Sequence, residues 1–212
     1  MKIEALIFDL GGVVFDYSFE QAYQAWSVIT GRPVSEIKEQ FHFSGDFERF
    51  ERGDITPEQF IASVSTQLGH TFDADSFEQG WNAIYDDVIP GMDQLLASLH
   101  TDYPLVALTN TNQIHAKVWK GKYATVLQHF DKVFVSCEMA ARKPEQHVFE
   151  MVTNYLRLPA DHILFLDDNG DYTASAAGMG MHAATVSSYN QVVAALAHHG
   201  VYPPAHLAPP YK

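Results

Sequence analysis

Four groups of polar residues, far apart along the chain, carry side chains suited to chemistry on a phosphoryl group. In chain order they are Asp9, the pair Thr109 and Asn110, Lys143, and the pair Asp167 and Asp168. Each group alone is weak evidence, because such residues at the ends of strands commonly form turns and helix caps. Three of the groups directly follow a short apolar run, and Lys143 follows another run after a short interval. Because the carboxyl ends of parallel strands meet at one edge of a sheet, we expect the four groups to lie close together.

This combination of side chains predicts phosphoryl transfer. A carboxylate can attack phosphorus only if the repulsion between the two anions is neutralised, which requires a hard cation on oxygen ligands and a fixed positive side chain. We predict that Asp9 is the nucleophile and one metal ligand, and that Lys143 is the fixed ammonium group. The adjacent carboxylates of Asp167 and Asp168 complete the predicted metal site, because neighbouring carboxylates repel one another unless a cation bridges them.

Two further features are typical of a loop that binds phosphate. The hydroxyl group of Thr109 is expected to donate a hydrogen bond to a phosphoryl oxygen, together with the backbone N–H of Asn110. Gly11 and Gly12 follow the nucleophile closely, and residues without a Cβ let the backbone approach the phosphate. Thr109, Asn110, Lys143 and Gly11 are therefore the predicted phosphate-binding residues.

The apolar runs predict an α/β fold with a parallel sheet. They are rich in β-branched and aliphatic residues, alternate with helical sequence, and cover residues 3–8, 105–108, 133–135, 163–166 and 183–186. Strands that are apolar on both faces are typical of a doubly wound sheet. Residues 15–86 show amphipathic helical patterns and no convincing strand, which predicts an inserted helical module between core segments 1–14 and 87–200. Residues 201–212 are Pro-rich and are expected to form a tail.

The helical module contains one helix with an explicit start signal. Thr56, Pro57 and Gln59 are typical of a capping box with Pro at the first helical position, so we predict a helix from Pro57 to about Leu68. Seven phenylalanines are expected to form the core of the module: Phe41, Phe43, Phe47, Phe50, Phe60, Phe72 and Phe77. Four charged residues are expected to form a solvated face: Glu48, Arg49, Glu51 and Arg52.

Composition and charge exclude several functions. The 212 residues are 47% hydrophobic, which is enough to bury a core. The net charge of −13 repels phosphate backbones and anionic lipid, so neither nucleic acid nor a membrane is an expected partner. The first apolar run is too short for a signal peptide or a membrane span, so a cytoplasmic protein is expected. The sequence does not define the oligomeric state.

The four groups and their neighbours resemble the ordered motifs of the haloacid dehalogenase superfamily. The similar segments are residues 7–13, 108–112, 142–145 and 165–169. The resemblance implies a Rossmann-like core, a helical cap after the first motif, an aspartyl-phosphate intermediate, and Mg²⁺ bound in part by the main-chain carbonyl of Gly11. Segments 25–27, 41–42, 51–53, 80–83 and 112–115 are similar to sugar-phosphate phosphatases of the α-glucose-1-phosphate phosphatase group. A small phosphorylated metabolite is the implied substrate, with Trp26, His42, Arg49, Trp81 and Tyr85 as implied pocket walls.

One departure from the family pattern affects the mechanism. Most phosphatases of the superfamily carry a second Asp two residues after the nucleophile, as general acid and base, and this position is Gly11 here. Either the enzyme acts on leaving groups that need little protonation, or another residue supplies the proton. Asp16 and His115 are the candidates for that role, and Asp171 is a candidate for additional acidic support of the metal.

Two other functions remain open. Hydrolytic dehalogenases of the superfamily also use an Asp nucleophile and lack the second Asp, but they need no metal, so the pair Asp167 and Asp168 argues against them. A non-catalytic descendant that binds a phosphorylated ligand or a protein is the other alternative, since the general acid is absent.

Overall fold

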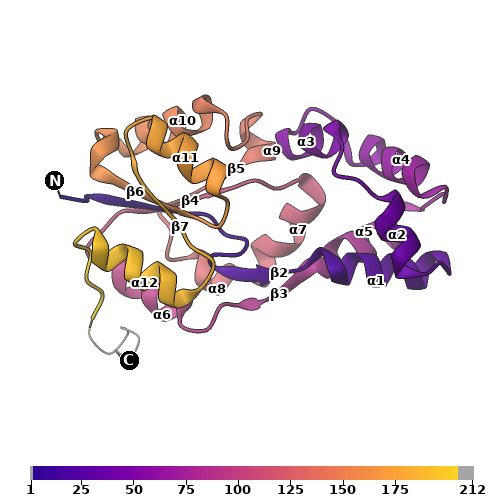
Figure 1. The fold of residues 1–212 in the computed structure, drawn as a ribbon, viewed down its shortest axis with the longest axis horizontal. Coiled ribbons are helices and arrows are strands. Elements are labelled where there is room, and N and C mark those ends of the chain that lie inside the picture. Colours follow the sequence, from indigo (N-terminus) through magenta and orange to yellow (C-terminus); the bar gives the residue numbers. More distant parts are fainter. Residues whose placement is uncertain (1, 205–212) are drawn as a thin grey trace.

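The computed structural model describes residues 2–204, and its core is a five-stranded parallel sheet (Figure 1). The strand order is β5-β4-β1-β6-β7. The strands are β1 (Ala5–Phe8), β4 (Leu105–Thr109), β5 (Lys132–Val135), β6 (Ile163–Asp167) and β7 (His182–Thr185). All five predicted strands and the predicted α/β class are confirmed. The predicted tail lies mostly outside the described residues, since 205–212 are not among them.

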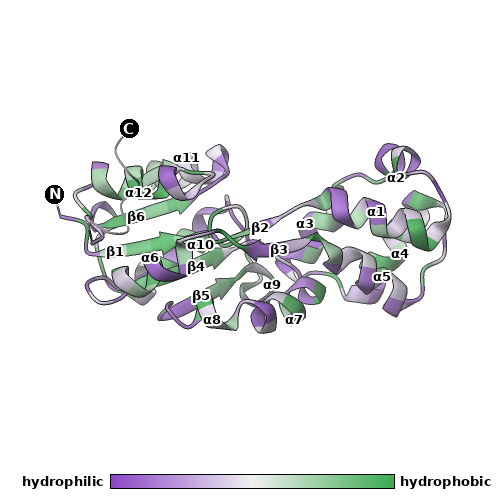
Figure 2. Cartoon of the chain, turned by 90° about the horizontal axis from the view of Figure 1, so that it is seen from below, coloured by the Kyte–Doolittle hydropathy of each residue, from purple (hydrophilic) through white to green (hydrophobic). Residues whose placement is uncertain are grey.

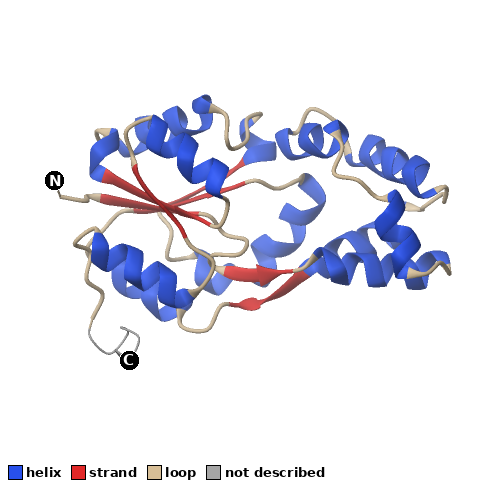
Figure 3. Ribbon diagram, in the orientation of Figure 1, coloured by secondary structure: helices blue, strands red, loops and turns tan. Residues whose placement is uncertain are grey.

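Helices cover both faces of the sheet (Figure 3). One face packs against α6 (Met92–Leu99), α7 (Gln113–Lys122), α8 (Ala124–Leu127) and α12 (Tyr189–His198). The other face packs against α10 (Gln146–Leu156) and α11 (Gly170–Gly178). The consecutive residues Leu6 and Ile7 of β1 point to opposite faces of the sheet and belong to different apolar clusters. Both faces of the strand are therefore buried, and apolar residues fill every position. Figure 2 shows the sheet strands as mainly hydrophobic ribbons between more polar helices.

Five helices form a separate bundle, the cap, which lies beyond the carboxyl ends of the strands (Figure 1). They are α1 (Phe19–Thr30), α2 (Val34–Gln40), α3 (Gly45–Arg52), α4 (Pro57–Leu68) and α5 (Ala74–Trp81). The capping box and the bounds predicted for α4 are confirmed. Trp26 and Trp81 stack at the centre of the cap, with ring centroids 5.4 Å apart. The cap therefore has an aromatic core of its own.

The expectation that the inserted segment contains no strand is wrong. β2 (Phe15–Tyr17) pairs antiparallel with β3 (Tyr85–Val88), and the two form a ribbon between the cap and the sheet. A short 3₁₀ turn (Asn82–Ile84) leads from α5 into β3. A strand of three residues is too short for its alternation to be recognised in the sequence, so the pairing with β3 is what defines it.

Three smaller findings complete the fold. Helix α10, which follows Lys143 in the chain, begins at Gln146. Of the seven phenylalanines expected in the cap core, Phe43 is 51% exposed and Phe47 is only partly buried, while the other five are buried. Across residues 2–204, none of the helices combines the length and the apolar character that crossing a bilayer would require.

The cap core should be sensitive to an added methyl group at Gly80. A Cβ at this position would lie against Cδ1 of Trp26 and 2.5 Å from its Nε1. We expect Gly80→Ala to lower the free energy of unfolding by about 1–3 kcal/mol, the range for overpacked cores. The control is Gly121→Ala in α7, where a Cβ meets no atom within 4 Å and the change favours the helix by about 1 kcal/mol at most. Urea unfolding measures both, and equal stability of the two variants would contradict the packing.

Candidate active site

A cavity of about 320 Å³ lies where the cap faces the carboxyl ends of the strands. The core lines it with the polar residues Asp9, Gly11, Thr109, Asn110, Lys143 and Asp168. The cap and ribbon add mainly aromatic side chains, namely Phe15, Tyr17, Phe19, Phe43, Phe47 and Tyr85. The sheet edge thus brings together the separated groups identified in the sequence, as the parallel-strand argument requires.

Lys143 is the central charge of the site. Its side chain is completely buried, and its Nζ lies 2.9 Å from Oδ1 of Asp9 and 2.5 Å from Oδ2 of Asp167. Burial lowers the pKa of the Lys143 ammonium, but the two carboxylates raise it more, so the net pKa is above the ordinary value. Burial raises the pKa of Asp9 to about 7, and Asp167 adds to this effect while Lys143 opposes it. The site therefore holds a permanent cation against a carboxylate that is easily protonated.

The three carboxylates form a group that fits a divalent cation. Asp9, Asp167 and Asp168 each place one oxygen within 4.8 Å of the others. Among the described residues, Lys143 is the one ammonium paired with these acids, so the ionised cluster carries an excess of two negative charges. Hard oxygen ligands with this excess are what Mg²⁺ prefers. Asp167 also accepts the N–H of Asn169 at 2.8 Å and the ammonium of Lys143, so it holds the lysine in addition to facing the metal site.

Gly12 is required at this site by both its backbone and its surroundings. Its φ is +76°, and a Cβ would lie 2.5 Å from Oδ2 of Asp168. A side chain at this position would displace the carboxylate that completes the metal site. The group that approaches Gly12 closely is a side chain of the protein, and the approach of the backbone to phosphate stays a prediction.

Asn110 and Ser136 fix the loops that present the polar groups. The Asn110 side chain donates to the carbonyl of Lys143 and accepts its N–H, both at 2.9 Å. The Ser136 hydroxyl accepts the N–H of Thr111 at 2.9 Å and donates to the carbonyl of Glu51 at 2.6 Å. The Thr109 side chain lines the cavity directly. Asn110 therefore acts through its side chain on the Lys143 loop, a role that its residue type alone did not indicate.

The position of the missing second Asp is filled by an aromatic ring. A Cβ at Gly11 would lie 3.1 Å from Cδ1 and Cε1 of Tyr17. Tyr17 belongs to β2 of the ribbon and lines the cavity. A side chain at position 11 would therefore require the ring to shift by a few tenths of an ångström.

The two candidates for a replacement proton donor are placed unfavourably. Asp16 is exposed and is not one of the described residues that line the cavity. His115 lines the cavity, but its Nε2 lies 3.0 Å from the carbonyl of Trp81 and its Nδ1 lies 3.1 Å from Nδ2 of Asn112. Burial lowers the pKa of His115 to about 3. The ring is therefore neutral, and both of its nitrogens are engaged.

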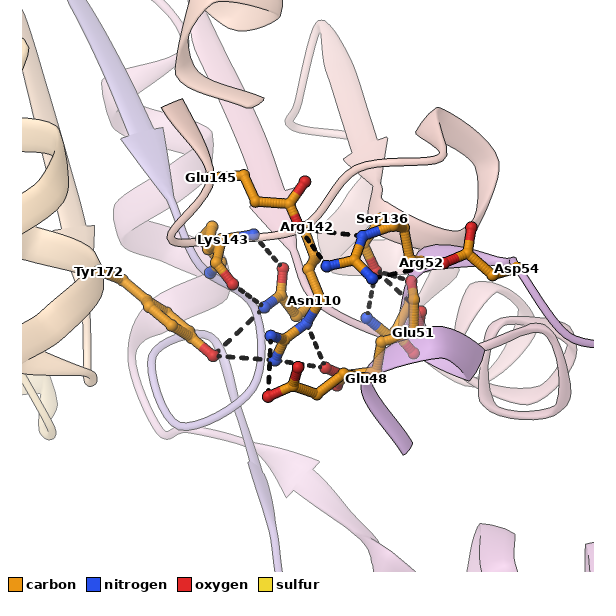
Figure 4. Close-up of polar contacts among 11 residues, drawn as sticks. Glu48, Glu51, Arg52, Asp54, Asn110, Ser136, Arg142, Lys143, Glu145 and Tyr172 are labelled. Atoms are coloured by element: carbon orange, nitrogen blue, oxygen red, sulfur yellow. Dashed lines mark hydrogen bonds and ion pairs between the residues drawn. The ribbon is translucent and has the colours of Figure 1, made fainter. Parts of the chain in front are cut away.

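The cap contributes a charged group that the sequence did not indicate (Figure 4). Glu51, expected on a solvated face, is buried and lines the cavity, so that expectation is wrong. Its Oε2 pairs with Nη2 of Arg142 at 2.8 Å and with Nε of Arg142 at 3.0 Å. Arg52 pairs with Glu145 of the core, and Arg49 pairs with Asp46 within the cap. Glu51 became buried because α3 docks on the short helix α9 (Ser136–Met139), a tertiary contact without a local signal.

Only part of the implied pocket wall is correct. Tyr85 lines the cavity. Trp26 and Trp81 are completely buried inside the cap, and neither is among the described cavity-lining residues, nor are His42 and Arg49.

Comparisons with known proteins agree with this site. A sequence profile described as haloacid dehalogenase-like hydrolase matches residues 3–180. The chain is 22% identical over 78% of its length to the D-ribitol-5-phosphate phosphatase of Bacteroides thetaiotaomicron, and covers 83% of that protein. A crystal structure of a haloacid dehalogenase family enzyme from the same organism, in complex with magnesium and inorganic phosphate, is 30% identical with a TM-score of 0.76. That match covers 86% of this chain and 93% of the other.

The chain therefore belongs to the haloacid dehalogenase-like hydrolase family, and its site is of the phosphatase type that uses Mg²⁺. The L-2-haloacid dehalogenase of Xanthobacter autotrophicus is also similar, with a TM-score of 0.64 and 19% identity over 97% of this chain and 86% of that one. At this identity the likeness shows the fold alone. The fold does not distinguish a phosphatase from a dehalogenase, so the distinction must come from the acidic cluster.

Mg²⁺ should stabilise the folded protein, because a ligand that binds only the folded state adds its binding free energy, about 2.7 kcal/mol at a hundredfold excess over Kd. We expect thermal melting at pH 8 to show a higher Tm with Mg²⁺ than without it. The rise should be smaller at pH 6, because Asp9, with a pKa of about 7, is then mostly protonated and the proton competes with the cation.

Two variants test the ligands. Asp168→Asn removes a carboxylate of the cluster and should abolish most of the rise in Tm. Asp171→Asn is the matched control, because Asp171 is exposed in the first turn of α11 and is outside the cluster of described acidic residues. Equal effects of the two substitutions would contradict the assigned site.

Proposed function

We propose that the protein is a Mg²⁺-dependent phosphatase that hydrolyses a small phosphorylated metabolite through an aspartyl-phosphate intermediate. One observation carries the proposal. Lys143 is buried between Asp9 and Asp167, and Asp168 completes the cluster of three carboxylates. A group of carboxylates with one ammonium favours a cation and a phosphoryl group together, whereas halide displacement has no use for the excess negative charge.

Each residue has a defined role in the proposal. Asp9 attacks phosphorus, and Lys143 neutralises a phosphoryl oxygen while Asp167 holds the lysine in place. Thr109 donates its hydroxyl to another phosphoryl oxygen, and Asn110 orders the Lys143 loop and offers its backbone N–H. Asp9, Asp168 and the main-chain carbonyl of Gly11 hold Mg²⁺, with Asp167 beside them. Mg²⁺ supplies the charge that lets one anion approach another.

The substrate we propose is a sugar phosphate, such as glucose 1-phosphate. A volume of about 320 Å³ is at the lower end of the range for small-molecule sites. Aromatic faces from the cap suit the C–H faces of a sugar, and Arg142 and Tyr172 offer polar groups to its hydroxyls. The similarity to a phosphatase of a sugar alcohol phosphate supports the same class.

A screen of phosphorylated metabolites tests the function directly. Purified protein with Mg²⁺ should release inorganic phosphate from one or more sugar phosphates, and release should stop with EDTA. Asp9→Asn should fall to the background rate, because an amide cannot act as the nucleophile. The same protein incubated with 2-haloacids should release no halide.

Two outcomes would reject the proposal. Halide release that persists in EDTA would identify a dehalogenase. Binding of phosphorylated ligands without phosphate release, and with equal affinity in Asp9→Asn, would identify a non-catalytic protein.

A further inference from the structure

Among the described residues that line the cavity, Glu51 is the one carboxyl group that comes from the cap. It is carried by α3 of the cap, and its side chain is 9% exposed. It lines the same cavity as the nucleophile Asp9 and as Tyr17, the residue that fills the place of the missing acid. Burial raises the pKa of the Tyr17 phenol, and the charges of Asp168, Asp9 and Glu51 raise it further.

The two oxygens of Glu51 are in different situations. Oε2 accepts both contacts from Arg142, at 2.8 and 3.0 Å. No hydrogen bond within residues 2–204 reaches Oε1. This oxygen is therefore free to carry a proton, while Arg142 fixes the orientation of the group and stabilises the carboxylate after the proton has left.

The position of Glu51 is fixed by the docking of the cap. Gly53, which ends α3 at a φ of +82°, brings the helix so close to α9 that a Cβ would lie 2.5 Å from the carbonyl of Cys137. Ser136 holds the Glu51 carbonyl, and Arg142 also lies 3.7 Å from Glu48 (Figure 4). A closely docked backbone and a paired guanidinium together hold the carboxyl group in one place.

The other titratable groups of the cavity are unsuited to proton transfer. Asp9 and Asp168 belong to the metal site, and the arginine and lysine stay charged. His115 is neutral with both nitrogens engaged. The phenols of Tyr17, Tyr85 and Tyr172 have pKa values raised by burial, so they remain protonated and cannot serve as a base for water.

We propose that Glu51 is the general acid and base of the reaction, in place of the carboxyl group that is absent at Gly11. This inference rests on the proposed phosphatase function. In the first step a bond forms between Asp9 and phosphorus, the bond from phosphorus to the leaving oxygen breaks, and the proton of Glu51 passes to that oxygen. In the second step water attacks phosphorus, gives its proton to the Glu51 carboxylate, and displaces Asp9, which restores both groups.

Burial and the positive charges around Glu51 act in opposite directions on its pKa, and the net effect is a rise. Burial raises its pKa above the ordinary value, and Glu48 on the same helix adds to the rise. Arg142 and Lys143 from the core oppose it. As a general acid Glu51 must be protonated, so kcat/KM should fall as the pH rises through its pKa, and this limb of the profile should disappear in Glu51→Gln.

A comparison of substrates with different leaving groups distinguishes a catalytic role of Glu51 from a structural one. We expect Glu51→Gln to lower kcat/KM for alkyl and sugar phosphates by about 10²–10⁴-fold, the range for general acid catalysis. The loss for p-nitrophenyl phosphate should be small, because nitrophenolate leaves without a proton. Glu39→Gln is the matched control, because Glu39 is an exposed residue of α2 in the cap and is not among the described residues that line the cavity, so it should behave like the wild type. Phosphate release with Mg²⁺ measures all three proteins, and Tm values show that each is folded.

Three outcomes would overturn the assignment. An equal loss of kcat/KM on all leaving groups would make Glu51 a structural residue, and the absence of any loss in kcat/KM or kcat would remove it from the reaction. If the pH limb persisted in Glu51→Gln, another group would be the acid. Failure of the wild-type protein to release phosphate from any substrate is a different result, which would reject the phosphatase function itself together with this role.

Discussion

The placement of one ammonium group between two carboxylates is the interaction on which the site depends. Lys143 is completely buried, and it can stay charged only because Asp9 and Asp167 lie within 2.9 Å of its Nζ. Removing the ammonium would leave two buried carboxylates without compensation, and breaking a buried ion pair typically costs about 3–5 kcal/mol. The same pairing orders the nucleophile before any substrate arrives. The charge balance and the strand geometry hold Lys143 between Asp9 and Asp167. The two hydrogen bonds from the Asn110 side chain to the Lys143 backbone support the same arrangement.

The division between what was and was not predictable from the sequence follows from where each signal lies. Asp9 and Asp167 each end a strand whose apolar residues identify it, so their common edge follows from the rules of parallel sheets. Glu51 has neighbours typical of a solvated helix face, and nothing local to α3 indicates that α9 will cover it. Tyr17 lies in a three-residue strand whose partner β3 is distant in the chain. Residues whose environment comes from docking of the cap could not be placed before the structure.

The cavity combines two kinds of wall. The sheet supplies charged and hydrogen-bonding groups in fixed positions, and the cap supplies rings and the Glu51–Arg142 pair. The cap core lies around Trp26 and Trp81. The cap contacts the sheet domain through the ribbon, through the α3–α9 contact and through α7, whose Ile114 packs in the same cluster. Side chains such as Phe19, Phe43 and Phe47 thus shape the space around a substrate but do not hold the charged groups at the sheet edge in place.

The ring of Tyr17 over Gly11 limits which residues position 11 accepts. A Cβ there would lie 3.1 Å from the ring, so any residue larger than glycine requires the ring to shift by a few tenths of an ångström. The identity of residue 11 in the core and the placement of the β2 ribbon are therefore coupled: a change of side chain beside the nucleophile is transmitted to the strand that leads into the cap.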